Sequence, residues 1–462
     1  MKKWKNGIKS NKPLIHKVPF RQKAYFGISI AGVSFIQSMI DGSMLKFYTD
    51  FILFPTILFG IVQLIFGIWN SLNDPLIGYY SDKTLLTNKR VTRKRWLYRA
   101  IPFIAIGYFS IIFMNPEIPV VFIFVILLIG LAIQDTGGAI FHINRNALLV
   151  SITDEDSERS SLVVVSLIFQ TILGIFTYLL PLIFLIEDTP LWVLYIMFSV
   201  VGAISVIISF LGIKGIQEPA NLYKEKSFIQ LKTVLRDMFK FKSFIYFVLI
   251  SFLINAVAAT TLTFQLFYFQ YVAEITGLKA TLASTIALPV TFGAYFLMQI
   301  CNKKIGPRKS LLTFIIISIT GYIGLLFFTE YLTVIIFYIM ILMGNSAYWI
   351  YSMPIFGNII DEYESKIGKR NEGTFMGIRA IFESPSKSVM IFLFTVIINN
   401  MGYIGGQEQI PSAILGIKIG VSILPIIFLL SGFLLLLLFP LKGKKLQKLK
   451  ELTRKLYDSR LD

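Results

Sequence analysis

Several ionisable side chains stand inside segments that are otherwise apolar. Arg379, Glu383 and Lys387 follow one another at intervals of four residues, so they form one charged stripe on a helix. Asp41 and Asp135 lie in two further apolar runs. An ionised group is costly in apolar surroundings unless it has a partner or faces a polar cavity. We therefore expect these side chains to act in function or to pair with one another during a working cycle.

A second group of polar side chains follows helical spacing. Asn70, Asn73 and Asp74 fall on one face of a helix because they are three and four residues apart. Their oxygens could coordinate Na⁺, or the carboxylate could carry a proton. A structural hydrogen-bond network between helices fits the same residues equally well, and the sequence leaves both interpretations open.

Amides, carboxylates and aromatic rings occur together in the apolar runs, and this combination suits a sugar. Rings stack on pyranose faces, and amides or carboxylates bind the hydroxyls. The aromatic candidates fit packing or lipid contact as well. A proton mechanism is a further hypothesis, because a histidine in the set titrates near neutral pH. The predicted substrate-binding residues are Gln37, Asp41, Asp135, His142, Asn345, Tyr348, Trp349, Glu383 and Lys387.

Enzyme and metal chemistry lack the residues that they need. The chain has two histidines, His16 and His142, and one cysteine, Cys301, so neither a Cys/His metal site nor an intrachain disulfide is expected. No nucleophile–base pair or phosphate-binding loop occurs at a useful spacing. We therefore predict a protein that is not an enzyme and that has no metal or cofactor apart from a coupling ion, H⁺ or Na⁺.

The composition places these residues in a membrane. Of the 462 residues, 55% are hydrophobic and 15% are charged, and the mean hydropathy of +0.71 is too high for an ordinary soluble protein. A membrane helix needs roughly 20 apolar residues. The predicted fold class is an all-α membrane protein with twelve transmembrane helices, at 25–48, 56–80, 97–114, 119–146, 161–186, 191–212, 243–272, 280–301, 310–329, 332–358, 375–399 and 413–440.

The formal net charge of +18 comes from basic residues beside these runs. Lys and Arg crowd the N-terminal segment, the loops after the second, sixth and eighth runs, and the C-terminal tail. The alternate loops carry mainly acidic residues, among which we count Asp50. By the positive-inside rule, both termini of this multi-pass cell-membrane protein lie in the cytoplasm. The charge thus reflects topology and contact with anionic lipid, and no nucleic-acid partner is expected.

The chain divides into two similar halves. The longest loop separates two sets of six runs, so we predict an N-terminal bundle at 1–212, a cytoplasmic linker at 213–242 and a C-terminal bundle at 243–462. A basic stretch follows the second run of each half, after Gly78 in the first and after Asn302 in the second. This parallel repeat is typical of the major facilitator fold, in which two six-helix bundles are related by pseudo-symmetry.

Three segments resemble one transporter family closely. They are Trp69–Gly78 with Ser81-Asp82 and Thr92–Trp96, Asn146–Leu149 with Thr153–Arg159, and Asp361–Gly373. Together they are similar to the glycoside–pentoside–hexuronide:cation symporters, the melibiose permease family, over essentially the whole chain. The resemblance implies a monomeric secondary active transporter in the lipid bilayer. It would move a small molecule, a sugar or glycoside, by alternating access with H⁺ or Na⁺.

Two alternatives stay open beside this interpretation. Relatives of these symporters carry lysophospholipids, so a carrier of an amphiphile with the same fold is the first alternative. A wide apolar cavity would favour it, whereas a closed polar cavity with Tyr348 and Trp349 facing inward would favour a sugar. The second alternative is a membrane sensor that does not transport.

The helix ends on the cytoplasmic side carry a further predicted set of charges. Ion pairs there would hold the two halves together while the carrier faces outward, and would break and re-form during the cycle. Anchoring of the helix ends at the membrane interface is the alternative. The predicted cytoplasmic gate consists of Asp82, Arg93, Arg95, Arg159, Asp361, Lys369, Arg370 and Glu372.

The recognition residues of melibiose permease are replaced in this chain. Its sugar-contacting Asp of the first helix, Asp of the fourth, Arg of the fifth and Lys of the eleventh fall on or near Ser34, His142, Leu167 and Ser384. Asp41 and Lys387, one or two turns away, could replace part of this chemistry or pair across the cavity. The family's typical second carboxylate of the cation site is Asn70 here, which removes one negative charge from that group.

Overall fold

The computed structural model describes residues 18–87, 92–152, 156–218, 236–367 and 372–461, and no β-strand occurs among them. The first half of the chain forms α1 (Phe20–Lys46), the π-helical turn η1 (Phe47–Phe51), α2 (Thr56–Thr87), α3 (Arg93–Ile112), α4 (Val120–Ile152), α5 (Asp156–Phe184) and α6 (Leu191–Gly215). The second half forms α8 (Lys242–Phe267), η2 (Tyr268–Val272), α9 (Gly277–Phe327), α10 (Tyr331–Ile367), α11 (Glu372–Asn400), α12 (Pro411–Lys418), η3 (Ile419–Ile423), α13 (Leu424–Leu438) and α14 (Gly443–Leu461).

These helices supply the twelve predicted spans. Among the described residues, ten helical segments are long and apolar enough to cross a membrane, and one of them joins α12, η3 and α13. The long helix α9 contains two spans, because the chain bends at Gly306, whose φ of 79° favours glycine, just before Pro307. The remaining span is α3, which starts with basic residues but packs along α4 and α6. The predicted twelve helices are thus confirmed, with ends shifted by a few residues.

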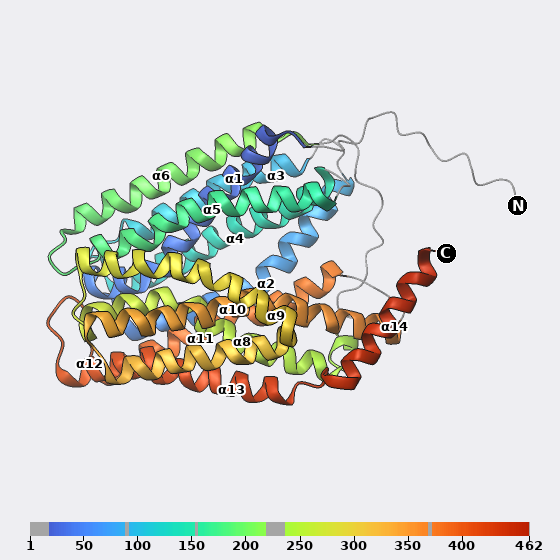
Figure 1. Cartoon of the computed structure of the whole chain (residues 1–462). Helices are drawn as coiled ribbons and strands as arrows, with labels where there is room; N and C mark the ends of the chain where they lie inside the picture. Colours follow the sequence, from blue (N-terminus) through green and yellow to red (C-terminus); the bar gives the residue numbers. More distant parts are fainter. Residues whose placement is uncertain (1–17, 88–91, 153–155, 219–235, 368–371, 462) are drawn as a thin grey trace, which may run out of the picture.

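The two halves pack as two bundles related by a pseudo-two-fold arrangement. Figure 1 shows the first bundle, coloured blue to green, lying above the second, coloured yellow to red. Within the first bundle α1 packs on α5 and α6, and α3 packs on α4. Between the bundles, α2 packs on α11 and α5 packs on α9. The second helix of each half therefore meets the fifth helix of the other half, which is the contact pattern of the major facilitator fold.

Glycines allow α2 and α11 to approach closely. A Cβ atom added at Gly60 would lie 2.1 Å from Thr395 Oγ1, and one added at Gly67 would lie 2.8 Å from the Cβ of Ser388. Small residues at such contacts are the usual means by which membrane helices pack, because lipid provides no hydrophobic driving force between them. This contact fixes the distance between two helices that line the site described below.

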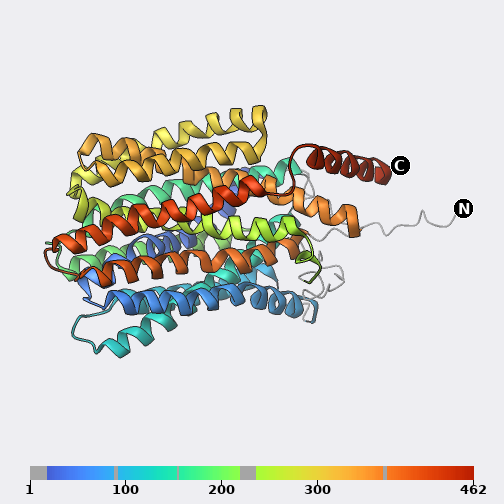
Figure 2. The same cartoon turned by 90° about the horizontal axis from the view of Figure 1, so that it is seen from below.

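The two ends of the molecule differ in charge. We call the end at which α1, α3 and α8 begin the basic end, since Lys23, Arg93 and Lys242 lie there. Figure 2 shows α14, in dark red, leaving the bundle at this same end. The opposite end contains η1, η2 and the turn between α11 and α12. Part of the predicted linker, 219–235, lies outside the described residues.

Candidate functional site

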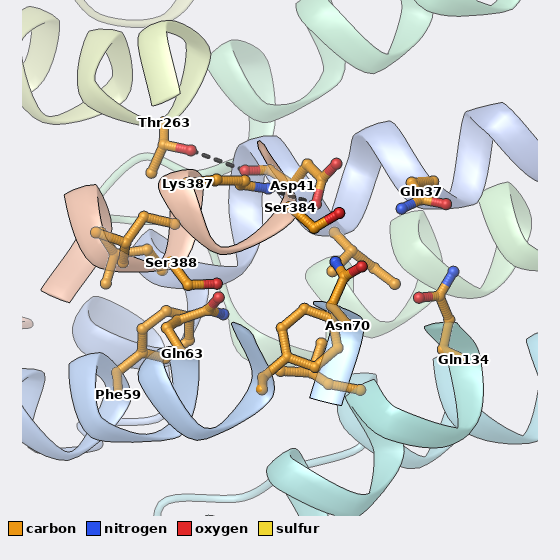
Figure 3. A pocket seen from close by; sticks show the side chains of 15 residues that line it. Gln37, Asp41, Phe59, Gln63, Asn70, Gln134, Thr263, Ser384, Lys387 and Ser388 are labelled. Carbon is orange, nitrogen blue, oxygen red and sulfur yellow. Dashed lines mark hydrogen bonds and ion pairs between the residues drawn. The ribbon is translucent and has the colours of Figure 1, made fainter. Parts of the chain in front are cut away.

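A polar cavity lies between the two bundles. It is lined by side chains of α1, α2 and α4 from the first bundle and of α8 and α11 from the second. Figure 3 shows these side chains converging on one space. Its lining includes more polar than apolar residues: the polar ones are Gln37, Asp41, Gln63, Asn70, Gln134, Thr263, Ser384, Lys387 and Ser388. Because both bundles supply walls, a solute held here would contact both halves of the protein at once.

An ion pair joins the bundles across this cavity. The ammonium of Lys387 on α11 contacts Oδ1 of Asp41 on α1 (Figure 3). The backbone oxygen of Asp41 also accepts a hydrogen bond of 2.7 Å from Thr263 Oγ1 on α8. The side chain of Asp41 is 45% exposed and that of Lys387 is 19% exposed, so both are accessible from the cavity. Two roles are predicted for these residues: they replace part of the family's recognition chemistry, or they pair across the cavity. The structure shows the pair.

The predicted cation-coupling residues divide between two places. Asn70 lines the cavity. Asn73 is buried behind it and donates a hydrogen bond of 2.9 Å from Nδ2 to Oδ2 of Asp135 on α4. Asp74 and Asp41 both lie within electrostatic range of Asp135. Asp135, predicted as a substrate ligand, therefore belongs with Asn73 and the half-buried Asp74 in an acidic group between α2 and α4.

The predicted charged stripe of α11 also divides. Arg379 Nε donates a hydrogen bond of 2.6 Å to Glu383 Oε1, and the hydroxyl of Tyr348 donates one of 2.7 Å to the same oxygen. Arg379 further donates to Ser352 Oγ at 3.0 Å. All four of these residues lie in the second bundle and outside the cavity lining. Only Lys387 of the stripe reaches across to the first bundle.

Three other predicted substrate ligands do not line the cavity. Asn345 is buried in the second bundle, where Nδ2 donates to Thr261 Oγ1 at 2.7 Å and to the Tyr322 hydroxyl at 3.2 Å. Trp349 is 58% exposed on the surface of α10. His142 is half-buried on α4 beside Phe141. Neither Trp349 nor Tyr348 lines this cavity, so the arrangement of these two rings that would favour a sugar is not seen here.

Four polar lining residues went unnoticed in the sequence: Gln63, Gln134, Thr263 and Ser388. One signal could have found the first of them. Phe59, Gln63, Phe66 and Asn70 line the cavity from α2, and their spacing of four, three and four residues marks one helical face. No comparable pattern indicates Gln134 or Thr263, which each enter the cavity through the packing of their helices.

A buried charge cluster connects the bundles at the opposite end. The Lys46 ammonium lies 2.7 Å from Oδ2 of Asp50, and only 1% of the lysine side chain is exposed. The hydroxyl of Tyr271 donates to the same oxygen at 2.7 Å, and the hydroxyl of Tyr403 donates to Oδ1. Lys46 also lies 4.5 Å from the centre of the Tyr271 ring, a cation–π contact. The prediction that Asp50 lies in a loop is wrong, because η1 continues the helix α1 and buries this residue.

The predicted gate at the basic end is described in part. Arg93 is buried and donates from Nη1 to Asn144 Oδ1 at 2.9 Å and to Ser81 Oγ at 3.2 Å, all within the first bundle. Arg95 is exposed, and Arg159 and Asp361 are half-buried. The side chains of Asp82 and Glu372 are not among those described, and Lys369 and Arg370 lie outside the described residues. The expected ion pairs between the halves therefore stay a prediction.

The protein has a polar cavity between two six-helix bundles, and the second helix of each bundle packs on the fifth helix of the other about a pseudo-two-fold axis. These features define a membrane transporter of the major facilitator fold. The sequence comparison agrees, because residues 25–443 match the family model described as "MFS/sugar transport protein". The chain belongs to this family, and among its members it is of the glycoside–pentoside–hexuronide:cation symporter type. It is therefore a transporter and not an enzyme.

Three relatives match along nearly their whole length. The "Uncharacterized symporter YnaJ" of Bacillus subtilis (strain 168) is 22% identical, with 93% of this chain and 94% of the relative covered. The "Isoprimeverose transporter" of Lactiplantibacillus pentosus is 23% identical, with 92% and 90% covered. The "Sodium-dependent lysophosphatidylcholine symporter 1" of Xenopus tropicalis is 22% identical, with 97% and 92% covered.

A solved structure supports the fold independently. A bacterial homolog of the human lysosomal transporter Spinster, at 13% identity, superposes with a TM-score of 0.66 over 91% of this chain and 97% of its own. Similarity at this level of identity shows the architecture only. The predicted major facilitator fold is confirmed by it.

Proposed function

We propose that the protein carries a sugar or glycoside across the cell membrane by alternating access. The observation that supports this most strongly is the cavity between the bundles, whose walls carry amides of the first half and hydroxyls of the second half. Amide and hydroxyl groups both donate and accept hydrogen bonds, so they match the hydroxyls of a sugar. A relative that carries isoprimeverose fits the same solute class.

The coupling ion is proposed to bind beside this cavity. Asp135, Asp74 and Asn73 together place two carboxylates and an amide between α2 and α4. Asp135 would replace the carboxylate that the family has at the position of Asn70. Ionisable groups inside a membrane bundle are the usual carriers of protons or cations in transporters. Either H⁺ or Na⁺ fits this group.

The orientation follows from the charges. We propose that the basic end faces the cytoplasm, since Lys and Arg flank the spans there and the opposite end is acidic. Both termini would then be cytoplasmic. The segment 213–242 would be a linker between bundles at 1–212 and 243–462, and the predicted gate residues would close the cytoplasmic side. The carrier is proposed to work as a monomer.

A lipid carrier is the competing proposal, because one relative is a lysophosphatidylcholine symporter. The two proposals differ in the solute that should stabilise the protein. The test is a thermal-shift screen of the purified full chain against sugars, glycosides, nucleosides and lysolipids, with and without Na⁺ at two pH values. A ligand that binds the folded state raises the melting temperature. We expect at least one sugar or glycoside to do so. Stabilisation by amphiphiles alone would overturn the sugar proposal.

A further inference from the structure

Among the residues that the structure describes, one acid and one base line the cavity. Of the residues that line it, Asp41 and Lys387 are the ionisable ones, and they contact each other. Their charges cancel, so the lining carries no net charge. The other polar members, such as Gln37, Gln63 and Asn70, are uncharged amides or hydroxyls. A solute that enters therefore meets hydrogen-bonding groups and a base that is already paired.

Among the described residues, the charged groups other than Asp41 and Lys387 lie outside the cavity lining. Asp135 lies within electrostatic range of Asp41 on the side of the first bundle, and a carboxyl group cannot serve as a cation for an anionic solute. Arg379 donates to Glu383 within the second bundle. Arg145 donates to Ser166 Oγ and stacks its guanidinium over a phenylalanine ring. An anionic solute group would thus have to displace Asp41 from Lys387, next to a second carboxylate.

We infer that the Asp41–Lys387 pair makes this cavity selective for uncharged sugars and excludes sugars that carry a carboxylate or sulfonate. The inference deepens the proposed function and rests on it. An anionic solute group that takes Lys387 would leave the Asp41 carboxylate without its counter-ion and beside a new negative charge, and like charges repel each other. A neutral sugar needs no such exchange, since its hydroxyls can bind the amides while the pair stays closed. The cavity then discriminates between solutes through the repulsion of acidic sugars as much as through its hydrogen bonds to neutral ones.

The pair also predicts how the preference can be changed. In Asp41→Asn the base Lys387 is left unpaired in the cavity wall, so an acidic sugar gains a partner. In Lys387→Gln the acid Asp41 is left unpaired, so an acidic sugar is repelled further. The double variant Asp41→Asn/Lys387→Gln removes both charges and restores a neutral lining. A merely structural role of the pair would alter binding of both solute classes together.

The experiment compares solutes that differ at one carbon. Methyl glucoside and methyl glucuronide, and the corresponding galactose pair, differ only in a hydroxymethyl or a carboxylate group. Binding of each to the purified full chain is measured by thermal shift and by equilibrium titration. We expect the wild type to bind the neutral member at least about tenfold more tightly, which corresponds to about 1.4 kcal/mol. Asp41→Asn should lower this ratio by about tenfold, Lys387→Gln should raise it, and the double variant, which has neither a free base nor a free acid, should lie between the two single variants.

The quantity compared is the ratio of two affinities of the same variant, so the comparison remains valid where a variant is partly unstable. Equal affinity of the wild type for both members of a pair, or a ratio that Asp41→Asn leaves unchanged, would overturn the inference while leaving the sugar proposal intact. If neither a neutral nor an acidic sugar binds the wild type while a lysolipid does, the proposed function fails and the inference fails with it. These outcomes are distinguishable in one set of titrations.

Discussion

At the scale of single residues, the structure divides the polar side chains of the spans into those that line the cavity and those that hold helices together. Asp41 and Lys387 belong to the first kind, and Asn345 belongs to the second. The sequence alone could not make this division, because both kinds are polar residues in apolar helices. Each kind responds differently to substitution, so each can be tested by itself.

Substitution of Asn345 should affect stability rather than solute binding. Asn345→Leu would remove the donor to Thr261 and the Tyr322 hydroxyl, and leave Ser318 without its acceptor. An unsatisfied buried polar group costs about 1–3 kcal/mol. We expect a lower melting temperature, with the stabilisation by sugar preserved. Unchanged stability together with lost sugar binding would show instead that Asn345 is a ligand.

Substitution of Asp135 should uncouple transport. Asp135→Asn keeps a side chain of similar size beside Asn73 but removes the charge that would carry the ion. In proteoliposomes we expect ion-driven accumulation of the sugar to fall about tenfold or more, while exchange of labelled for unlabelled sugar continues. The control is Ser71→Ala on the neighbouring helix α2, whose hydroxyl donates to the Gly67 backbone oxygen of its own helix. Normal accumulation by Asp135→Asn would assign the coupling ion elsewhere.

At the scale of elements, the contact between α2 and α11 sets the width of the cavity. Gly60→Val would place its side chain against Thr395 Oγ1, with the Cβ only 2.1 Å away. We expect this change to force the helices apart and to abolish transport, since overpacking costs about 1–3 kcal/mol. The control is Gly174→Val on α5, where nothing lies within 4 Å of the added Cβ. Equal transport by both variants would show that the close contact is not required.

The cluster of Lys46, Asp50, Tyr271 and Tyr403, which we call the opposite-end cluster, should respond to substitution as a buried ion pair does. Asp50→Asn would leave the Lys46 charge buried without its counter-ion, a loss of about 3–5 kcal/mol. We expect the double variant Lys46→Met/Asp50→Leu to regain part of this stability, because apolar replacement of a whole buried pair is tolerated better. Thermal unfolding of the wild type and both variants measures the difference. A double variant less stable than Asp50→Asn would mean that the tyrosine hydroxyls, not the charges, dominate the cluster.

The sequence predicts which segments form helices better than it predicts which side chains contact one another. Apolar runs of sufficient length can only be helices in a bilayer, so the twelve spans were predictable. The partners of the α11 stripe were not, although Arg379, Glu383 and Lys387 are evenly spaced. Eight residues turn a helix by about 80° beyond two full turns, so the first and last of the three face different neighbours. The spacing of Lys46 and Asp50 by four residues was an available signal for the buried pair.

At the scale of the whole molecule, charged groups join the two bundles both in the cavity and at the opposite end. One is the Asp41–Lys387 pair in the cavity, and the other is the cluster of Lys46 and Asp50 with Tyr271 and Tyr403 at the opposite end. Alternating access requires that the bundles rock about the cavity, so that contacts at one end break while those at the other end form. The opposite-end cluster would then hold that end closed in the state that the structure describes.

The central claim is that the cavity between the bundles opens to each side of the membrane in turn and holds the sugar. It is tested most directly with one cysteine at Ser384 in a Cys301→Ser background, labelled by a membrane-impermeant thiol reagent in vesicles of both orientations. Ser384 lines the cavity and is half-buried, and Cys301 is the native thiol that must be removed. The account predicts labelling from both faces and protection by a neutral sugar that the carrier binds. Labelling from one face only, or labelling that this sugar does not slow, would contradict it.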